Sequence, residues 1–246
     1  DVRTLADETI ADPGGDLRDL RDYLGSDYDL QRLRGHMGLI AEEWRRIGDE
    51  AAFYRNSQAY LYDLTVFALS GTKEPYLEVL RRLVPPPAHV LDYGCGIGSD
   101  GIRLLESGYR VTFADFDNPS TRYLRWRLER RGLRADVVDL DRDDVPTGLD
   151  AAFAFDVIEH VPDPYEMLEC LERSARLVVV NFLAEGDDHA EVHRSLPVRR
   201  LVLRAAMRRL RHYGLYHDRS HLVAYEPRRA PLRSLPVLAA GRWRTR

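Results

Sequence analysis

Four acidic residues of this 246-residue chain stand at matching positions, each at the end of a short apolar segment. They are Asp92, Asp115, Asp139 and Asp156. Carboxylates accept hydrogen bonds from hydroxyl and amino groups and attract positive charge. Parallel sheets bind their ligands at the carboxyl ends of the strands. We therefore expect the four side chains to lie along one sheet edge and to hold a ligand that carries hydroxyl groups and a positive charge.

A glycine-rich turn follows the first of these acids and reads Gly94-Cys95-Gly96-Ile97-Gly98. Glycine lets the backbone turn tightly and approach a ligand closely, because no Cβ stands in the way. Such a turn alone is weak evidence, since it also occurs in tight turns without a ligand. Dinucleotide-binding proteins usually space the glycines as G-x-G-x-x-G to seat a pyrophosphate, and this spacing differs.

The glycine turn, with Asp92 two residues before it, resembles motif I of class I S-adenosylmethionine methyltransferases. In that family Asp115 would accept the ribose hydroxyls, with Asp117 as the competing candidate, and Phe116 would lie against adenine. Asp139 would bind the adenine amino group, unless it belongs to a solvated acidic loop. The cofactor-binding residues that the resemblance implies are Asp92, Gly94, Cys95, Gly96, Gly98, Asp115, Phe116, Asp139, Leu140, Phe155 and Asp156.

The segment 155–164 resembles the loop after the fourth strand in small-molecule methyltransferases, which include ubiquinone and menaquinone biosynthesis enzymes and natural-product methyltransferases. Methyl transfer is an in-line displacement at a positively charged sulfur, so the enzyme supplies positioning and, for a protonated acceptor, a base. We predict His160 and Glu159 as catalytic residues. In the alternative interpretation His160 only shapes the loop. Asp156, Glu159 and His160 also resemble the divalent-metal ligands of ubiquinone O-methyltransferases.

Two histidine pairs occur late in the chain, His189 with His193 and His217 with His221. We expect both pairs near the cleft, where they would bind the acceptor directly or through a metal ion. The alternative is that they are surface histidines in polar loops, and we predict no resident metal ion. The aromatic stretch 53–62 is typical of a pocket wall, and Tyr54 and Tyr60 are its predicted substrate contacts.

The pattern of elements predicts an α/β fold: a Rossmann-like, doubly wound, mostly parallel seven-stranded sheet with a helical N-terminal cap. Strands are expected at 89–93, 110–115, 135–139, 149–155 and 176–182, with helices at 98–107, 119–131 and 164–173. Helices at 58–69 and from Thr72 as N-cap to 84 precede a proline linker at 85–87. The predicted segments are a cap (1–87), a cofactor-binding domain (88–227) with a late insertion (184–212) near the cleft, and a basic tail (228–246).

Composition and charge bound the class of protein. Hydrophobic residues make up 44% and charged residues 31%, as in soluble globular proteins, and the apolar runs are too short to span a bilayer. The absence of an apolar leader and of a cysteine framework predicts a cytoplasmic location. Acidic residues gather in 1–30 and arginines in 191–246. We expect a basic amphipathic helix over 196–211, neutralised by the acidic segment within the molecule or between subunits of a homo-oligomer.

The sequence therefore predicts transfer of a methyl group from S-adenosyl-L-methionine to a small-molecule acceptor at a hydroxyl oxygen, with S-adenosyl-L-homocysteine as product. N- and C-methylation stay open. A nicotinamide-dependent oxidoreductase is the first alternative, disfavoured by the glycine spacing and by Lys73 being the only lysine and outside the sheet domain. A non-catalytic adenosyl-binding module is the second. We do not expect nucleic acid as partner, because 156–159 lacks the N/D-P-P-Y/F motif of nucleic-acid methyltransferases.

Overall fold

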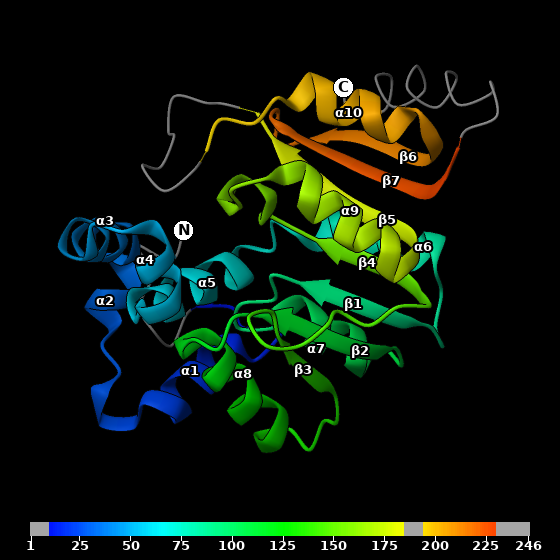
Figure 1. Ribbon diagram of the computed structural model, residues 1–246. Coiled ribbons are helices and arrows are strands. Elements are labelled where there is room, and N and C mark those ends of the chain that lie inside the picture. Colours follow the sequence, from blue (N-terminus) through cyan, green and yellow to red (C-terminus); the bar gives the residue numbers. More distant parts are fainter. Residues whose placement is uncertain (1–9, 185–193, 230–246) are drawn as a thin grey trace.

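A seven-stranded sheet is the centre of the computed structural model, which describes residues 10–184 and 194–229 (Figure 1). The strand order is β3-β2-β1-β4-β5-β7-β6, and only β7 runs antiparallel to its neighbours β5 and β6 among the described pairs. This confirms the predicted fold class. The strands are β1 (His89–Tyr93), β2 (Arg110–Asp115), β3 (Asp136–Asp139), β4 (Leu149–Ala154), β5 (Ala175–Leu183), β6 (Arg208–Tyr216) and β7 (Ser220–Arg229).

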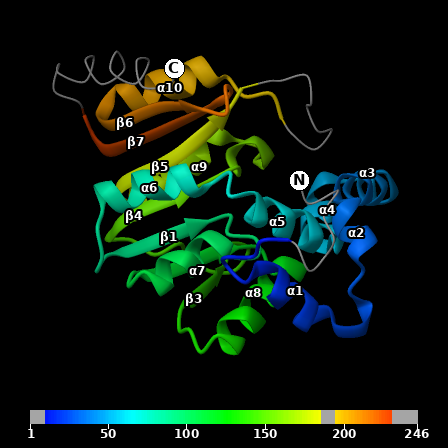
Figure 2. The ribbon, with the colours of Figure 1, turned by 180° about the vertical axis from the view of Figure 1, so that it is seen from behind.

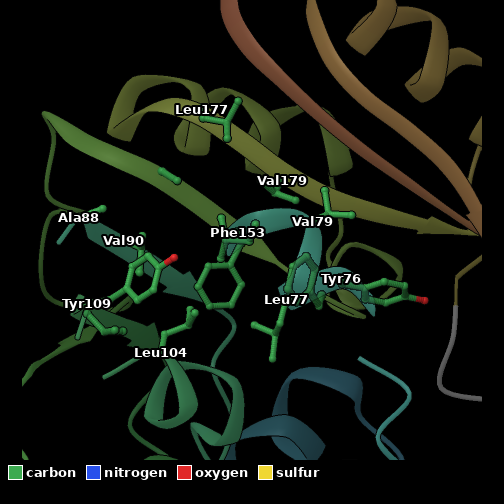
Figure 3. Packing of buried hydrophobic residues seen from close by; sticks show 14 of the residues in the cluster. Tyr76, Leu77, Val79, Ala88, Val90, Leu104, Tyr109, Phe153, Leu177 and Val179 are labelled. Carbon is green, nitrogen blue, oxygen red and sulfur yellow. The ribbon is translucent and has the colours of Figure 1, made fainter. Parts of the chain in front are cut away.

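Helices cover both faces of the sheet, because its central strands are apolar on both sides. One face packs Val90 and Phe153 against Leu77 of α6, as Figure 3 shows. The other face packs Val178 against Leu168 of α9 and residues of α10. The sheet helices are α6 (Glu74–Leu83), α7 (Ser99–Glu106), α8 (Pro119–Arg130), α9 (Pro164–Ser174) and α10 (Val198–Ala206).

The helices α1–α5 form the cap, which lies at the carboxyl end of the strands rather than on a sheet face (Figures 1 and 2). The cap has apolar clusters of its own, one around Leu33 and Leu61 and another around Ile40 and Phe53. Its helices are α1 (Asp16–Leu24), α2 (Leu30–Arg34), α3 (His36–Ile47), α4 (Glu50–Asn56) and α5 (Ala59–Ser70), with a short 3-10 turn η2 (Gly25–Asp27) after α1.

Local signals set most of the helix ends. Asn118 caps α8 with its side chain, which accepts from the amide of Thr121, and Pro119 follows at the first position. This is the predicted arrangement. At α6 the prediction of Thr72 as N-cap was wrong by one residue: Lys73 holds the N-cap position and no side chain caps the helix. Helix α6 precedes the predicted boundary at 87, yet it packs on the sheet, and β7 runs on to Arg229.

The prediction of one basic helix over 196–211 was wrong. Helix α10 ends at Ala206, and the chain enters β6 at Arg208 because backbone pairing with β7 takes over there. Leu210 is buried in β6 between the exposed residues Arg209 and Arg211, which is the alternation of a strand. None of the helices in the described part of the chain is long and apolar enough to cross a membrane.

Within the described part of the molecule the acidic N-terminal segment does not neutralise the basic region, and the alternative of pairing between subunits stays a prediction. The acids of α1 pair with arginines of α8 and of its C-cap position instead, through the contacts Asp16–Arg127, Asp22–Arg130 and Asp19–Arg131. The arginines of α10 and β6 have nearer partners: Arg204 and Arg208 contact Glu172, and Arg209 and Arg211 contact Glu226.

Candidate active site

The glycine turn joins β1 to α7, and its geometry requires glycine. Gly94, Gly96 and Gly98 have φ of 69°, 52° and 73°, in the left-handed region that favours residues without a Cβ. A Cβ on Gly94 would lie 2.5 Å from Val157 Cγ1, and one on Gly96 would lie 2.8 Å from Leu64 Cδ1. The turn therefore packs closely between the loop after β4 and helix α5 of the cap. The thiol of Cys95 is buried, which raises its pKa well above the usual range.

Asp92 and Asp115 accept hydrogen bonds from backbone amides in and around this turn. The Asp92 carboxylate accepts from the Gly101 amide at 3.0 Å, and Asp115 accepts from the amides of Gly96 at 2.8 Å and Phe116 at 2.7 Å. Burial raises the pKa of both carboxyl groups, against the backbone hydrogen bonds that lower it. Both predicted acids therefore lie at the carboxyl edge, beside the glycines that they were predicted to accompany.

The residues predicted to hold adenine gather at the ends of β2 and β3. Asp139 pairs in register with Asp115, and the amide of Leu140 donates to the Asp115 carbonyl at 3.0 Å. The Asp139 carboxylate accepts from the Asp141 amide at 3.1 Å. Asp117 turns away, because its exposed carboxylate contacts arginines of α8. This geometry favours Asp115 over Asp117 as the ribose ligand.

Asp156, directly after β4, is fixed in an uncommon conformation with a φ of 56°. Its amide donates to Asn181 Oδ1 at 2.8 Å, and the Asn181 amide group donates back to Asp156 Oδ1 at 2.6 Å. Asn181 also donates to the hydroxyl of Ser220, which accepts from Tyr76 at 2.7 Å. The other oxygen, Asp156 Oδ2, is buried with no hydrogen-bond partner.

The sequence interpretation missed Lys73, which it placed outside the sheet domain. The first turn of α6 brings this side chain to the end of β4, where Nζ donates to the Phe155 carbonyl at 3.0 Å. It lies 3.6 Å from Asp100 Oδ2 and 3.9 Å from Asp156 Oδ2. Burial acts to lower the pKa of Lys73, but these carboxylates outweigh it and raise that pKa, so the amine is charged. Its being the only lysine was the one available signal.

Glu159 and His160 lie in η3 (Ile158–His160), the turn after Asp156. Glu159 is 2% exposed, and its Oε2 has no hydrogen-bond partner. Burial, followed by the charge of Asp156, raises the pKa of Glu159 to about 8. The Nδ1 of His160 is 2.8 Å from the hydroxyl of Tyr54, on cap helix α4. The ring of Tyr60 packs edge-on against that of Tyr54, with centroids 5.7 Å apart.

The predicted histidine pairs are only partly placed. His217 is in the β6–β7 turn, and its Nε2 is 3.1 Å from the Thr72 carbonyl. His221 Nδ1 is 2.9 Å from the hydroxyl of Tyr213. His189 and His193 lie outside the described residues, so their role stays a prediction. Within residues 10–184 and 194–229 no group of three or more His, Cys, Asp or Glu could hold a metal ion, and this includes the set at 156–160.

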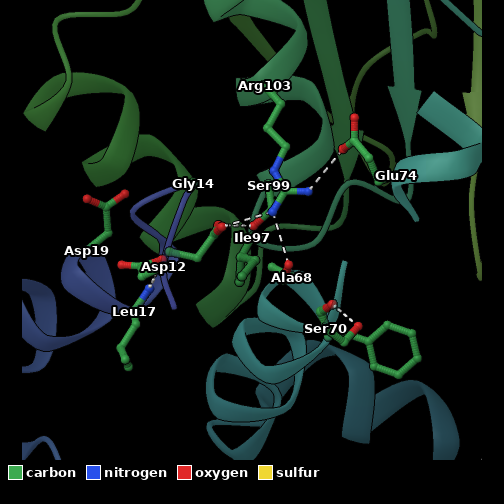
Figure 4. A network of polar contacts seen from close by, with 12 residues as sticks. Asp12, Gly14, Leu17, Asp19, Ala68, Ser70, Glu74, Ile97, Ser99 and Arg103 are labelled. Carbon is green, nitrogen blue, oxygen red and sulfur yellow. Dashed lines mark hydrogen bonds and ion pairs between the residues drawn. The ribbon is translucent and has the colours of Figure 1, made fainter. Parts of the chain in front are cut away.

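A buried cluster of polar side chains links the cap to the glycine turn. Arg127, which is fully buried, donates to the Ile97 carbonyl at 2.8 Å and to Asp16 of α1 at 2.6 Å. Asp16 also accepts from the hydroxyl of Ser99, the first residue of α7. Figure 4 shows Arg103 nearby, reaching both the Ala68 carbonyl and the carboxylate of Glu74. The cap is therefore tied to the segment that it covers.

Solved structures similar to this chain share its fold at low sequence identity. PH0226 protein from Pyrococcus horikoshii OT3 is 17% identical, with a TM-score of 0.53 over 76% of this chain and 99% of that one. Magnesium protoporphyrin IX methyltransferase from Synechocystis PCC 6803, solved with bound S-adenosylmethionine, is 19% identical, with a TM-score of 0.51 over 86% and 96%. TehB from Haemophilus influenzae is 16% identical, with a TM-score of 0.52 over 61% of this chain, which spans 60% of TehB.

The fold is the class I, Rossmann-like one, and the candidate site lies at the carboxyl edge of its sheet. Residues 91–176, from β1 into β5, match the family model described as a methyltransferase domain. No curated protein matches the chain in sequence. Residues 91–176 of the chain therefore carry a methyltransferase domain with the class I fold, and the chain is an enzyme whose cofactor is S-adenosylmethionine.

Proposed function

We propose that this enzyme transfers the methyl group to a hydroxyl oxygen of a small-molecule acceptor, with His160 as the base. The observation that carries the proposal is the group of charges at the end of β4. There, two buried carboxyl oxygens, Asp156 Oδ2 and Glu159 Oε2, have no hydrogen-bond partner, and the ammonium group of Lys73 lies 3.9 Å from Asp156 Oδ2. Buried polar atoms without partners are rare and need an explanation, and at the edge of a candidate site a bound ligand is one such explanation.

The bound cofactor supplies an activated methyl group on a positively charged sulfur, next to an amino acid part with an ammonium and a carboxylate. The unpartnered oxygen of Asp156 suits one of the two positive groups, and that of Glu159 suits the other, since a bound cation favours the ionised form of this carboxyl group and lowers its raised pKa. Lys73 suits the carboxylate: an ammonium has three donors, and among the described residues the Phe155 carbonyl alone lies within hydrogen-bond distance of it. Asp115 would accept from the ribose, and Asp139 and Phe116 would contact adenine.

The protein itself would orient the acceptor and take up its proton. Tyr54 holds Nδ1 of His160, so the ring is fixed with respect to the cap that covers the site. A hydroxyl of the acceptor would donate its proton to Nε2 of His160 as the new bond forms. A positioned base of this kind contributes about 10²–10⁴-fold to a rate. The half-buried rings of Tyr54 and Tyr60 suit an acceptor with an apolar or aromatic body.

Two measurements test the proposal. Calorimetric titration should show binding of S-adenosylhomocysteine and no binding of NAD⁺, which separates a methyltransferase from an oxidoreductase. Incubation with methyl-labelled S-adenosylmethionine and a library of phenols, alcohols, amines and activated carbon acids should then give a product labelled on oxygen. A product labelled on nitrogen or carbon would overturn the O-methylation, while leaving the cofactor site in place.

A cytoplasmic location is part of the proposal. Its support is chemical: Cys95 and Cys170 are both free thiols, as expected of a protein from a reducing compartment. Recovery of the native protein from the soluble cell fraction, with both thiols reactive after unfolding, is the expected result. Recovery in an oxidised or exported fraction would contradict it.

A further inference from the structure

Arg55 of cap helix α4 reaches the ends of two strands of the sheet at once. Its guanidinium carbon lies 4.3 Å from the ring centroid of Phe116, the residue after β2. Both terminal nitrogens donate to the carboxylate of Asp141, in the loop after β3, and the Nη2–Oδ1 distance is 2.9 Å. Next to Arg55, Tyr54 reaches the loop after β4. Helix α4 therefore spans the side of the site where adenine is expected.

The chemistry of these contacts is that of a planar stack. A guanidinium is flat, stacks on aromatic faces, and pairs with a carboxylate through two parallel hydrogen bonds that fix its plane. Phe116 presents one ring face to Arg55, and the same residue is the one proposed to contact adenine. A base inserted between them would need a spacing of about 7 Å from ring to guanidinium, two contact distances of about 3.5 Å. Adenine therefore cannot stack on this face of Phe116 while the guanidinium of Arg55 lies 4.3 Å from the ring centroid.

We propose that Arg55 is a cofactor-binding residue supplied by the cap. When the cofactor binds, its adenine takes the face of Phe116 and the guanidinium of Arg55 stacks on the outer side of the base. The inference rests on the proposed adenosyl site. The side chain of Arg55 is long and 38% exposed, so it can withdraw by one ring thickness without disturbing the apolar packing of the cap. Asp141, which is 44% exposed, can follow and keep the plane of the guanidinium fixed.

The experiment compares two ligands, S-adenosylhomocysteine and adenosine, by calorimetric titration of the full chain. A stacked cation contributes about 0.5–2 kcal/mol, or roughly 2- to 30-fold in affinity. Arg55→Ala should weaken binding of both ligands by the same factor in that range, because both carry the base. Arg55→Lys should keep the charge and lose most of the affinity that the stack provides. Arg46→Ala, at an exposed arginine of α3 that pairs with Glu43 inside the cap, is the matched control and should bind like the parent.

Each other result has a distinct meaning. If Arg55→Ala weakens S-adenosylhomocysteine but not adenosine, Arg55 acts on the amino acid part or on closure of the cap, and the stack is refuted. If Arg55→Ala tightens both ligands, the side chain only blocks the site and the proposal is wrong. If the parent protein binds neither ligand, the proposed adenosyl site itself has failed, whatever the variants do. Unchanged thermal midpoints of the variants would show that each measurement reports on a folded protein.

Discussion

The hydroxyl of Tyr54 lies 2.8 Å from Nδ1 of His160, although the two residues are 106 positions apart in the chain. One belongs to the cap and the other to the loop after β4. A hydrogen bond to one ring nitrogen of a histidine fixes the orientation of the ring and the tautomer available at the other. The candidate base is therefore positioned by a residue of the cap.

This contact predicts a graded loss of activity. Toward an acceptor found in the library screen, His160→Ala should lower kcat by 100-fold or more, because the base is removed. Tyr54→Phe should lower kcat about tenfold, because one hydrogen bond worth about 1.4 kcal/mol is lost and the ring is no longer fixed. The affinity for S-adenosylhomocysteine should stay within about twofold of the parent in both.

Tyr165→Phe, on the exposed side of α9, serves as the matched control and should leave kcat unchanged. A His160→Ala enzyme with the parent's kcat would show that the histidine only shapes the loop.

Asp115 and Asp117 form a matched pair for testing the ribose site. Asp115→Asn should weaken binding of S-adenosylhomocysteine by 30-fold or more, because a buried carboxylate that accepts hydroxyl groups contributes about 2 kcal/mol or more. Asp117→Asn should bind like the parent, because that carboxylate faces the arginines of α8. Calorimetric titration measures both. The reverse order of effects would reassign the ribose to Asp117.

The position of Lys73 predicts that its removal weakens the binding of one ligand more than that of another. Lys73→Met should weaken binding of S-adenosylhomocysteine about tenfold or more, because a charge-assisted hydrogen bond to the cofactor carboxylate is removed. Binding of adenosine should change little, since it lacks the amino acid part. The two titrations together separate this role from a general disturbance of the site. Equal losses for both ligands would mean that Lys73 only stabilises the protein around Asp100 and Asp156.

The raised pKa of Glu159 predicts a dependence of stability on pH. In the folded protein this carboxyl group loses its proton near pH 8, whereas its ordinary value is 4.5. Between these values the folded state holds a proton that the unfolded state has lost. The contribution of Glu159 to the free energy of unfolding is therefore fully present below about pH 4.5 and is lost as the pH rises toward 8, by up to about 1.4 kcal/mol per pH unit.

Urea unfolding at pH 5, 6.5 and 8 measures this effect. As the pH rises, the free energy of unfolding of the parent should fall relative to that of Glu159→Gln. Glu78→Gln, at an exposed position of α6, should run parallel to the parent. A parallel course for Glu159→Gln as well would show that the carboxyl group is ionised over the whole range.

Arg127 is expected to be the most costly single arginine to remove among those compared. Arg127→Met removes the fully buried guanidinium that pairs with both Asp16 and Asp19 and leaves these buried acids to the more exposed Arg103 and Arg131, a change that costs about 3–5 kcal/mol of unfolding free energy. Denaturant unfolding measures the loss. Arg130→Met, three residues on, removes an exposed contact with Asp22 and should leave the midpoint close to that of the parent. Equal midpoints for the two variants would contradict the role given to the cluster.

The part of the site that sequence reasoning found is the part encoded locally. The glycine turn and the acids at Asp92, Asp115 and Asp139 each sit where a strand ends, so alternation of strands and helices was enough to bring them to one edge. The interaction of Tyr54 with His160 could not be read in this way. It joins two elements whose relative position depends on how the cap packs, and no local pattern records that.

The wrong predictions have a common physical cause, which is that tertiary pairing overrides a local pattern. Arginines at helical spacing continue past Ala206, so the sequence pattern does not show where β6 begins, and only the pairing of β6 with β7 shows it. The acids of α1 were matched to the basic end of the chain by net charge alone. Short-range geometry decides such pairs instead, and α8 lies beside α1. Lys73 was set aside because it precedes β1, while α6 carries it onto the sheet edge.

The place of β7 limits how far this enzyme can be trimmed. A fragment that ends at residue 176, where the methyltransferase-domain match ends, would stop at the beginning of β5. A longer fragment that kept all of β5 would still lack β7, the strand that pairs with it. The backbone of Val178 and Val180 would then face water, with an apolar and unpaired edge ready to add strands from other molecules. We expect such a fragment to aggregate on expression, and only versions that retain residues 208–229 to stay monodisperse.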